Sequence, residues 1–362
     1  MTTTRAAVLE SPRQLKTRTF RLPDIGEDDG LLRVEACGLC GTDHEQYTGH
    51  LPAGFAFIPG HEAVGIVEAV GPRAAERWGV APGDRVAVEV FLSCRGCASC
   101  VAGDYRRCER HGLADMYGFH AVGDAPALWG GYAEHQYLAP DSMLLPVPDS
   151  LDPVVATAFN PLGAGVRWGA VIPETGAGDV VAVLGPGIRG LSASVAAREA
   201  GAAFVMITGR GVRDAPRLAL ATSFGADLAV DTETTDPATA LRDATGGLAD
   251  IVIDVTAKAP GALAQAISLA RPGGKIVIAG TRASVETPGF IPDLIVYKEL
   301  QIIGALGVDA PAYRDALAIL ASGRWPFADL PREVASLDTV DALLETMAGE
   351  RDVPPVHAVL VP

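Results

Sequence analysis

The sequence has few cysteines, few aromatic residues and few basic residues for a chain of 362. Aromatic residues make up 6% of it, and its six cysteines all lie in the first third. Disulfide-stabilised domains are short and rich in cysteine, so clustered cysteines in a long chain indicate metal binding instead. The 29 basic and 44 acidic residues give a formal charge of -15, which argues against nucleic acids and anionic membranes as partners.

Long hydrophobic runs are also missing. No stretch reaches the roughly 18 apolar residues of a transmembrane helix, and the N-terminus has no apolar segment of signal-peptide length. We therefore expect a cytoplasmic protein. A hydrophobic content of 49% is enough for the cores of about two domains.

The pattern of apolar runs changes along the chain and predicts two kinds of domain. Short runs punctuated by turn residues predict irregular β-rich structure first. From Asp179, continuous apolar runs alternate with Ala-rich helical stretches, which is typical of a doubly wound parallel sheet. We expect an α/β protein with a β-rich domain at 1–165, a doubly wound domain at 166–305 and a C-terminal segment at 306–362 that returns to the first domain.

Four cysteines on one loop are the most specific motif. They are separated by two, two and seven residues, and they are Cys94, Cys97, Cys100 and Cys108. Four thiolates at this spacing can close a tetrahedral shell around zinc, although iron–sulfur clusters use the same set. We expect a structural zinc, because a closed shell has no open position for substrate.

A second candidate set is scattered over two short motifs. Cys40 lies in CGLCGTD, and His61 with Glu62 lie in PGHEAVG. A mixed set of thiolate, imidazole and carboxylate suits a catalytic zinc, which keeps an open position.

A glycine motif follows the first apolar run of the second domain. Gly185, Gly187 and Gly190 fit GxGxxG between a predicted strand and a predicted helix, which is the dinucleotide-binding pattern. The residues expected at the cofactor phosphates are Gly185, Gly187, Ile188, Arg189 and Gly190.

The end of the next predicted strand distinguishes the two nicotinamide cofactors. NAD-binding chains usually carry an acid there, about twenty residues after the motif, to bind the ribose hydroxyls. This sequence has Gly209 and Arg210, with Arg213 close by. A guanidinium binds a 2'-phosphate, so we expect NADP(H) in preference to NAD(H).

Together these residues resemble the zinc-dependent medium-chain alcohol dehydrogenases over nearly the whole chain. CGLCGTD, GHEAVGIVEAVG, PGDRVAV, the four-cysteine loop, GGYAEH and GPGIRG occur in the family's order. The resemblance implies a GroES-like catalytic domain, a Rossmann domain and a homo-oligomer, either dimer or tetramer. The CGTDHE motif most resembles that of the glucose and polyol dehydrogenase branch.

The resemblance also implies roles for single residues. Cys40, His61 and Glu62 would bind the catalytic zinc, and Asn160 stands where the family usually has an acidic or cysteine ligand. An amide is a weaker ligand, so this zinc is expected to be labile. Thr42 would take the substrate's proton, and His44 and Glu45 are equal candidates for the end of that relay. Turns expected to contact the ribose or the nicotinamide contain Thr256, Ala279, Gly280, Thr281, Leu306 and Gly307.

The region between the cysteine loop and GGYAEH borders the substrate cleft in that family. Here it contains Tyr117, Phe119 and Trp129, and an apolar wall favours an aliphatic or aromatic alcohol or aldehyde. A sugar or polyol dehydrogenase is the alternative enzyme. An NADP(H)-binding sensor or structural protein with little turnover is the alternative of another class.

Overall fold

The computed structural model describes residues 2–51, 53–113, 115–282, 284–347, 349–351 and 354–362. Over these ranges, no helix combines the length and the apolar character needed to cross a bilayer. The chain forms two compact units. The first contains Met1–Phe159 and Phe327–Pro362, and the second contains Asn160–Pro326.

The first unit is built on a mixed sheet with the strand order β14-β15-β3-β4-β5-β7, to which β6 adds by pairing with β3. Strands β1 and β2 form a separate antiparallel pair. The strands are β1 (Thr3–Ser11), β2 (Gln14–Arg21), β3 (Gly30–Leu39), β4 (Ala63–Val70), β5 (Arg85–Val88), β6 (His135–Leu138), β7 (Leu144–Pro146), β14 (Arg332–Ala335) and β15 (His357–Leu360). The helices are α1 (Gly41–Thr48), α2 (Pro72–Trp78), α3 (Ala98–Val101), α4 (Pro153–Ala156) and α12 (Val340–Met347).

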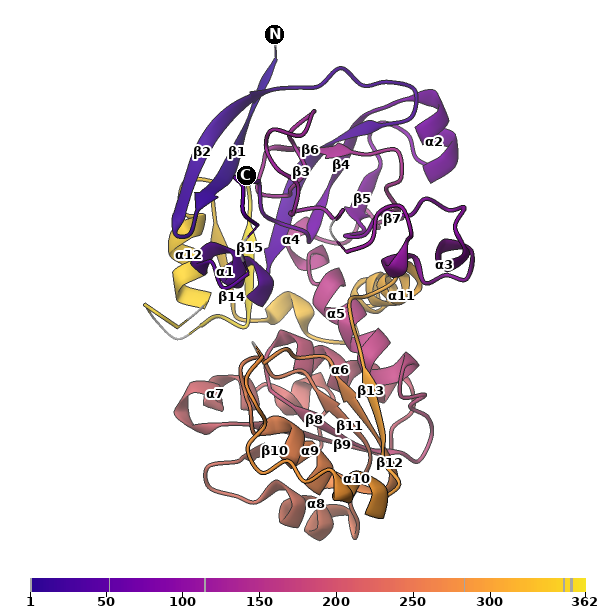
Figure 1. Cartoon of the computed structure of the whole chain (residues 1–362), viewed down its shortest axis with the longest axis vertical. Coiled ribbons are helices and arrows are strands. Elements are labelled where there is room, and N and C mark those ends of the chain that lie inside the picture. Colours follow the sequence, from indigo (N-terminus) through magenta and orange to yellow (C-terminus); the bar gives the residue numbers. More distant parts are fainter. Residues whose placement is uncertain (1, 52, 114, 283, 348, 352–353) are drawn as a thin grey trace. The chain divides into compact units, whose positions relative to one another are not determined.

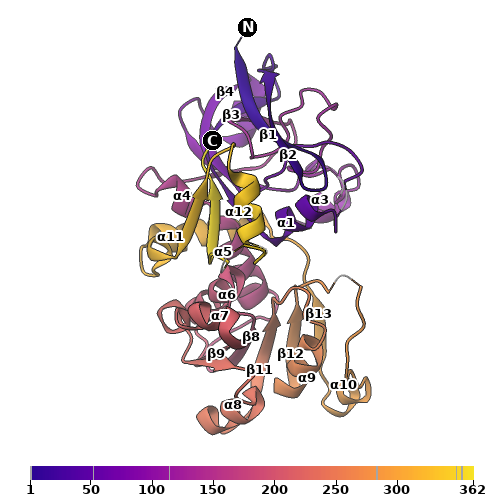
Figure 2. The same ribbon diagram turned by 90° about the vertical axis from the view of Figure 1, so that its left-hand side faces the viewer.

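The C-terminal segment completes this first sheet. Strand β15 pairs antiparallel with β3, where Leu360 lies opposite Cys37. In Figure 1 and Figure 2 this yellow segment lies beside the indigo strands from the start of the chain. The returning segment begins at Phe327, later than the expected residue 306. The reason is that α11 (Ala310–Ala321) packs within the second unit, where a Cβ at Gly163 would lie 2.5 Å from the Tyr313 ring.

The second unit is a six-stranded parallel sheet in the order β10-β9-β8-β11-β12-β13. This confirms the doubly wound α/β fold expected from the alternating apolar runs and Ala-rich stretches. The strands are β8 (Val180–Leu184), β9 (Phe204–Gly209), β10 (Leu228–Asp231), β11 (Ala249–Asp254), β12 (Ala270–Ile278) and β13 (Gln301–Gly304). The helices are α5 (Phe159–Val166), which begins at the unit boundary, α6 (Ile188–Glu199), α7 (Gly211–Leu218), α8 (Pro237–Thr245), α9 (Ala262–Leu269), α10 (Asp293–Tyr297) and α11.

Local sequence explains where these helices begin and end. The Asp236 side chain accepts the backbone N–H of Thr239 and caps α8, which has Pro237 in its first turn. The same helix ends at Gly246, whose φ of 79° favours glycine. Helix α6 is rich in Ala and Ser, and these small side chains let it pack closely on the sheet, where most of them are buried.

Candidate functional site

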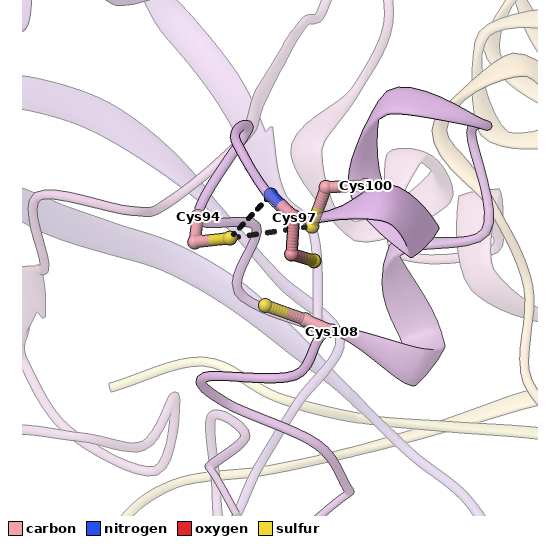
Figure 3. A group of neighbouring side chains, drawn as sticks. All are labelled: Cys94, Cys97, Cys100 and Cys108. Atoms are coloured by element: carbon pink, nitrogen blue, oxygen red, sulfur yellow. Dashed lines mark hydrogen bonds between the residues drawn. The ribbon is translucent and has the colours of Figure 1, made fainter.

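The four cysteines of the loop come together in the first unit. One ligand atom from each of Cys94, Cys97, Cys100 and Cys108 lies within 4.8 Å of the others. Figure 3 shows their sulfurs turned toward a common centre, with Cys100 carried by the short helix α3. Four sulfurs without a carboxylate or imidazole fit a closed zinc shell.

Backbone hydrogen bonds around this loop lower the pKa of Cys97 and Cys108, which favours the thiolate form of these two. The N–H of Cys97 donates to Cys94 Sγ across 3.4 Å. Burial raises the pKa of the Cys108 thiol, but backbone hydrogen bonds from Cys94, His111 and Arg110 outweigh it and lower this pKa to about 6. Burial instead raises the pKa of Cys100 to about 11, so zinc, which binds thiolates, would have to displace the proton of that thiol.

A second cluster, made by Cys40, His61 and Glu62, is buried in the same unit. One ligand atom of each lies within 4.8 Å of the other two. Cys40 Sγ and His61 Nε2 are 3.3 Å apart. Gly38 makes room for the carboxylate, since a Cβ at that position would lie 2.3 Å from Glu62 Oε2. Thiolate, imidazole and carboxylate at one buried point form a donor set that suits zinc.

Asp43, which was not expected from the sequence, links two members of this cluster. Asp43 Oδ2 accepts the backbone N–H of Cys40 at 2.8 Å, and Asp43 Oδ1 lies 3.7 Å from His61 Nδ1. Asp43 is 2% exposed, so solvent does not weaken this arrangement. A carboxylate behind a metal-binding histidine fixes its tautomer and ring orientation. The signal was present, because an acid three residues after an N-cap is a capping-box pattern.

Helix α1 separates the two candidates for the end of the proton relay. Residues three apart on a helix share a face, whereas residues two apart do not, so Thr42 lies on the side of Glu45. The imidazole of His44 instead lies with its Nε2 at 3.5 Å from Glu350 Oε1. This geometry favours Glu45 over His44.

Of the three aromatic residues expected at the substrate, Phe119 lies near the second cluster. Its ring centroid is 6.1 Å from that of His61. The structure corrects the expectation for Tyr117, which is 1% exposed and accepts the backbone N–H of Ala139 at its hydroxyl. Trp129 is half-buried, stacks on His120 with ring centroids 4.0 Å apart and packs against the core, and its place at the substrate stays a prediction. Of the three aromatic residues, only Tyr117 is fully buried in the core.

In the second unit, the glycine turn has the shape that a dinucleotide needs. Gly185 has a φ of 101°, which other residues rarely adopt. Gly187 caps α6, and a Cβ there would meet no atom within 4 Å, so the backbone is open to a ligand. A Cβ at Gly190 would lie 1.8 Å from the Gly185 carbonyl oxygen, so only glycine lets the helix pack this closely. These are the three roles of the glycines in a dinucleotide-binding turn.

Asp254, at the end of β11, organises several of the expected cofactor residues. Its wholly buried carboxylate accepts both the hydroxyl and the backbone N–H of Thr256, at 2.6 and 3.0 Å, and it pairs with Arg282. The Asp254 carbonyl accepts the N–H of Ala279 and that of Gly280, at 2.9 and 3.1 Å. This brings Thr256, Ala279 and Gly280 to one edge of the sheet. Asp254 was not expected from the sequence, although it is an acid at the end of a buried apolar strand.

The remaining expected cofactor residues lie on nearby turns of the same unit. The Thr281 carbonyl accepts the N–H of Lys258 at 3.0 Å. The Gly307 carbonyl, next to exposed Leu306, accepts the indole N–H of Trp168 at 3.0 Å. Arg189 places its guanidinium over the Trp168 ring, 5.5 Å from the centroid, and Ile188 begins α6.

Arg210 lies where the sequence analysis expects recognition of the cofactor ribose. It follows the last residue of β9, Gly209, and Arg213 is exposed on the first turn of α7. The Arg210 Nε donates to Glu233 Oε1 at 3.1 Å, so an acid from the loop after β10 reaches the same place.

Asn160 belongs to the second unit, and Cys40, His61 and Glu62 belong to the first. The Asn160 amide nitrogen donates to the Tyr313 hydroxyl at 3.0 Å, which leaves the amide oxygen as its acceptor atom. Its place among zinc ligands stays a prediction.

Comparisons with known proteins support the fold of both units. Residues 26–149 match the model of the alcohol dehydrogenase GroES-like domain, and residues 190–322 match that of zinc-binding dehydrogenases. A protein of Mycobacterium tuberculosis named a probable alcohol dehydrogenase is 68% identical over 99% of this chain and 98% of its own. Sorbitol dehydrogenase of Bacillus subtilis is 32% identical over 88% of this chain and 86% of its own. A solved structure from Sinorhizobium meliloti, named as a zinc-binding dehydrogenase bound to NADP, is 29% identical, covers 100% of both chains and has a TM-score of 0.82.

Proposed function

Because the chain belongs to the zinc-dependent medium-chain alcohol dehydrogenase family, we propose that it oxidises an apolar alcohol with NADP and reduces the matching aldehyde or ketone with NADPH. The family itself makes the chain an oxidoreductase. The cofactor preference and the apolar substrate are the proposed parts.

Cys40, His61 and Glu62 would hold the catalytic zinc, and the four loop cysteines would hold a structural one. A zinc ion in the first set supplies a Lewis acid that lowers the pKa of an alcohol, and NADP supplies the hydride acceptor. Asp43 Oδ1 lies 3.7 Å from His61 Nδ1, beyond hydrogen-bond distance, and its charge favours the tautomer with a proton on Nδ1, which leaves Nε2 for the metal. Phe119 gives the surroundings of His61 an apolar side, which favours an aliphatic or aromatic substrate.

Proton transfer is the step that the chain's own residues perform. Thr42 Oγ1 takes the proton of the substrate hydroxyl and passes its own proton on. Glu45, on the same face of α1, accepts it and exchanges it with water.

The observation that carries the cofactor preference is Arg210 at the end of β9, where NAD-binding chains carry an acid. A guanidinium makes charge-assisted, bidentate bonds to a phosphate, which NAD lacks at the ribose 2'-position. The relative from Sinorhizobium meliloti, solved with NADP, is consistent with this preference.

The test combines metal analysis with steady-state kinetics. Zinc per chain is measured first, and kcat/KM is then compared for NADP and NAD with benzyl alcohol, medium-chain alcohols, sorbitol and glucose. We expect two zinc ions per chain and the highest kcat/KM with NADP and an apolar alcohol. Faster turnover of sorbitol or glucose would favour the polyol alternative. Cofactor binding without turnover of any substrate, even with zinc added, would favour the sensor alternative.

We also propose that two copies of the chain associate through the second unit. Strand β13 ends the order of the six-stranded sheet, and among the described residues nothing pairs with its outer edge. The neighbouring helix α10 exposes Val296 and Tyr297, at 72% and 76%. An open edge beside apolar side chains is a template for pairing with another chain. Light scattering coupled to size exclusion should give a dimer or a multiple of it, and a monomer at all concentrations would reject this part.

A further inference from the structure

The loop that carries Arg210 is tied to the loop after β10 by fixed hydrogen bonds. Asp231 Oδ1 accepts the backbone N–H of Gly211 at 2.8 Å and that of Glu233 at 3.0 Å. The backbone N–H of Thr232 donates to the Gly209 carbonyl at 2.9 Å. The two loops therefore hold each other in place, and Glu233 is presented to Arg210 by backbone that cannot easily shift.

The three acidic residues near Arg210 make different contacts. Asp231 accepts the two backbone N–H groups just described. Asp214 accepts the backbone N–H of Arg210 at 2.9 Å and lies 3.3 Å from Arg217. Glu233 is the acid that the structure places on the guanidinium, at 3.1 Å from Nε. Its other oxygen lies against Gly211, where a Cβ would approach within 2.4 Å of Oε2.

We infer that Glu233 sets how strongly the chain discriminates between NADP and NAD, by competing with the 2'-phosphate for Arg210. This rests on the proposed role of Arg210. A 2'-phosphate can bind this guanidinium fully only if Glu233 turns away, and the carboxylate repels the phosphate while it remains. Removing the negative charge frees Arg210 and ends the repulsion, so the affinity for 2'-phosphorylated ligands increases.

The exposure of Arg210 and Glu233 allows a 2'-phosphate to replace Glu233 at the guanidinium. The side chains of Arg210 and Glu233 are 79% and 51% exposed, so water weakens their attraction. Glu233 also lines a wide surface depression of about 540 Å³, whose threonine hydroxyls can solvate the displaced carboxylate while Asp236 repels it.

The test measures binding of two nucleotide fragments by isothermal titration calorimetry, with no turnover involved. Adenosine 2',5'-bisphosphate and 5'-AMP differ only in the 2'-phosphate, and each is titrated into the full-length protein and its variants. We expect Glu233→Gln to tighten the bisphosphate by about threefold to tenfold at low salt, the range for an exposed charge pair plus a nearby like charge, with 5'-AMP unchanged. The gain should shrink at high salt.

Two further variants complete the design. Glu174→Gln is the matched control, because Glu174 forms an ion pair of 2.7 Å with Lys275 in the same unit and is 80% exposed. It should leave both affinities unchanged. Arg210→Gln tests the proposed function on its own, and it should weaken the bisphosphate by about tenfold or more and leave 5'-AMP unchanged.

The outcomes separate the two claims. If the natural chain prefers the bisphosphate and Arg210→Gln removes that preference, but Glu233→Gln changes nothing or weakens binding, the role of Glu233 is rejected and the NADP proposal stands. If the natural chain shows no preference and Glu233→Gln creates one, Glu233 holds the proposed role and the NADP preference is rejected. If none of the variants changes either affinity, both claims fail.

Discussion

The two candidate zinc clusters of the first unit are built in opposite ways. The four-cysteine cluster comes from one stretch of fifteen residues, and three of its members are only partly buried. The cluster of Cys40, His61 and Glu62 joins two distant motifs, and all three side chains are buried. Local loop geometry is enough for the first, whereas the second needs β3, α1 and the start of β4 to be in place.

This difference predicts that the four-cysteine cluster stabilises the fold and that the cluster of Cys40, His61 and Glu62 takes part in the reaction. A closed set of four sulfurs can only hold its loop together. If the buried set of three mixed ligands holds the proposed catalytic zinc, with Asp43 behind it and Phe119 beside it, it would leave a position for a substrate oxygen. Variants in the two clusters should therefore fail in different assays.

The largest effect is expected from Cys40→Ser. Lewis-acid assistance contributes several kcal/mol, and each 1.36 kcal/mol is tenfold in rate, so kcat/KM should fall by about a thousandfold or more. Elemental analysis should show the loss of one zinc per chain, with little change in the circular dichroism spectrum. Cys37→Ala is the control, since Cys37 is also buried but is not a cluster member. Activity within tenfold of the natural chain would contradict the assignment.

Cys97→Ser should act mainly on stability. A structural zinc contributes folding free energy directly, so losing it should lower the melting temperature by about 10 °C or more, as a loss of several kcal/mol implies. Differential scanning calorimetry and zinc analysis measure both effects. At a temperature where the variant is still folded, its kcat/KM should remain within a few-fold of the natural value. A normal melting temperature together with the loss of one zinc would show that the four-cysteine cluster does not stabilise the fold.

Asp43→Asn keeps the shape of the side chain and removes its charge. The loss of a carboxylate behind a metal-binding histidine typically costs about tenfold to a hundredfold in metal affinity or activity. Zinc competition with a chelator and kcat/KM should both report this loss, while the melting temperature of the zinc-loaded protein changes little. Equal zinc affinity and equal kcat/KM would mean that Asp43 only caps α1.

Glu45→Gln and His44→Gln form a matched pair on α1. Because water can replace a proton acceptor near the surface, Glu45→Gln should lower kcat by only about tenfold, less than the roughly hundredfold or more typical of acid–base groups, and alter the pH dependence of kcat. His44→Gln should leave both nearly unchanged, since His44 lies against Glu350. The reverse ranking would make His44 the end of the relay.

The last prediction concerns how acid acts on the stability of the first unit. Acid releases zinc from either cluster by protonating its ligands, but His357 adds an effect of its own. Burial, followed by the charge of Arg332, lowers the pKa of His357 to about 3, and Arg332 donates to its Nδ1 at 3.0 Å. Between pH 3 and the usual value of about 6.5, the unfolded chain binds a proton that the folded chain does not.

The free energy of unfolding should therefore fall as the pH drops through that range, by up to about 1.4 kcal/mol per pH unit. His357→Gln should make the decline shallower, because the amide can accept from Arg332 and donate to Thr157 without titrating. Urea unfolding of the zinc-free protein at a series of pH values measures both slopes. Identical slopes would assign all acid sensitivity to other groups.

Much of the fold was predictable because its signals are local. The buried strands β8 and β9 and the glycine turn before α6 are continuous in sequence, so their period and spacing were enough. The aromatic residues were not predictable in this way. One stretch carries Tyr117, Phe119 and Trp129, and their burial depends on contacts that the loop brings about. Tyr117 bonds to the backbone of Ala139, 22 residues further along the chain, and Trp129 stacks on His120.

The sequence by itself determined the two kinds of unit, the four-cysteine loop and the dinucleotide turn, because each depends on neighbours within a few residues. Only the tertiary structure decided that Asp43 stands behind His61, that Asp254 gathers the turns at the edge of the sheet and that Glu233 meets Arg210. These pairs join side chains from separate turns and strands. Chain spacing does not fix such distances, since they depend on how the strands pair and how the helices pack against them.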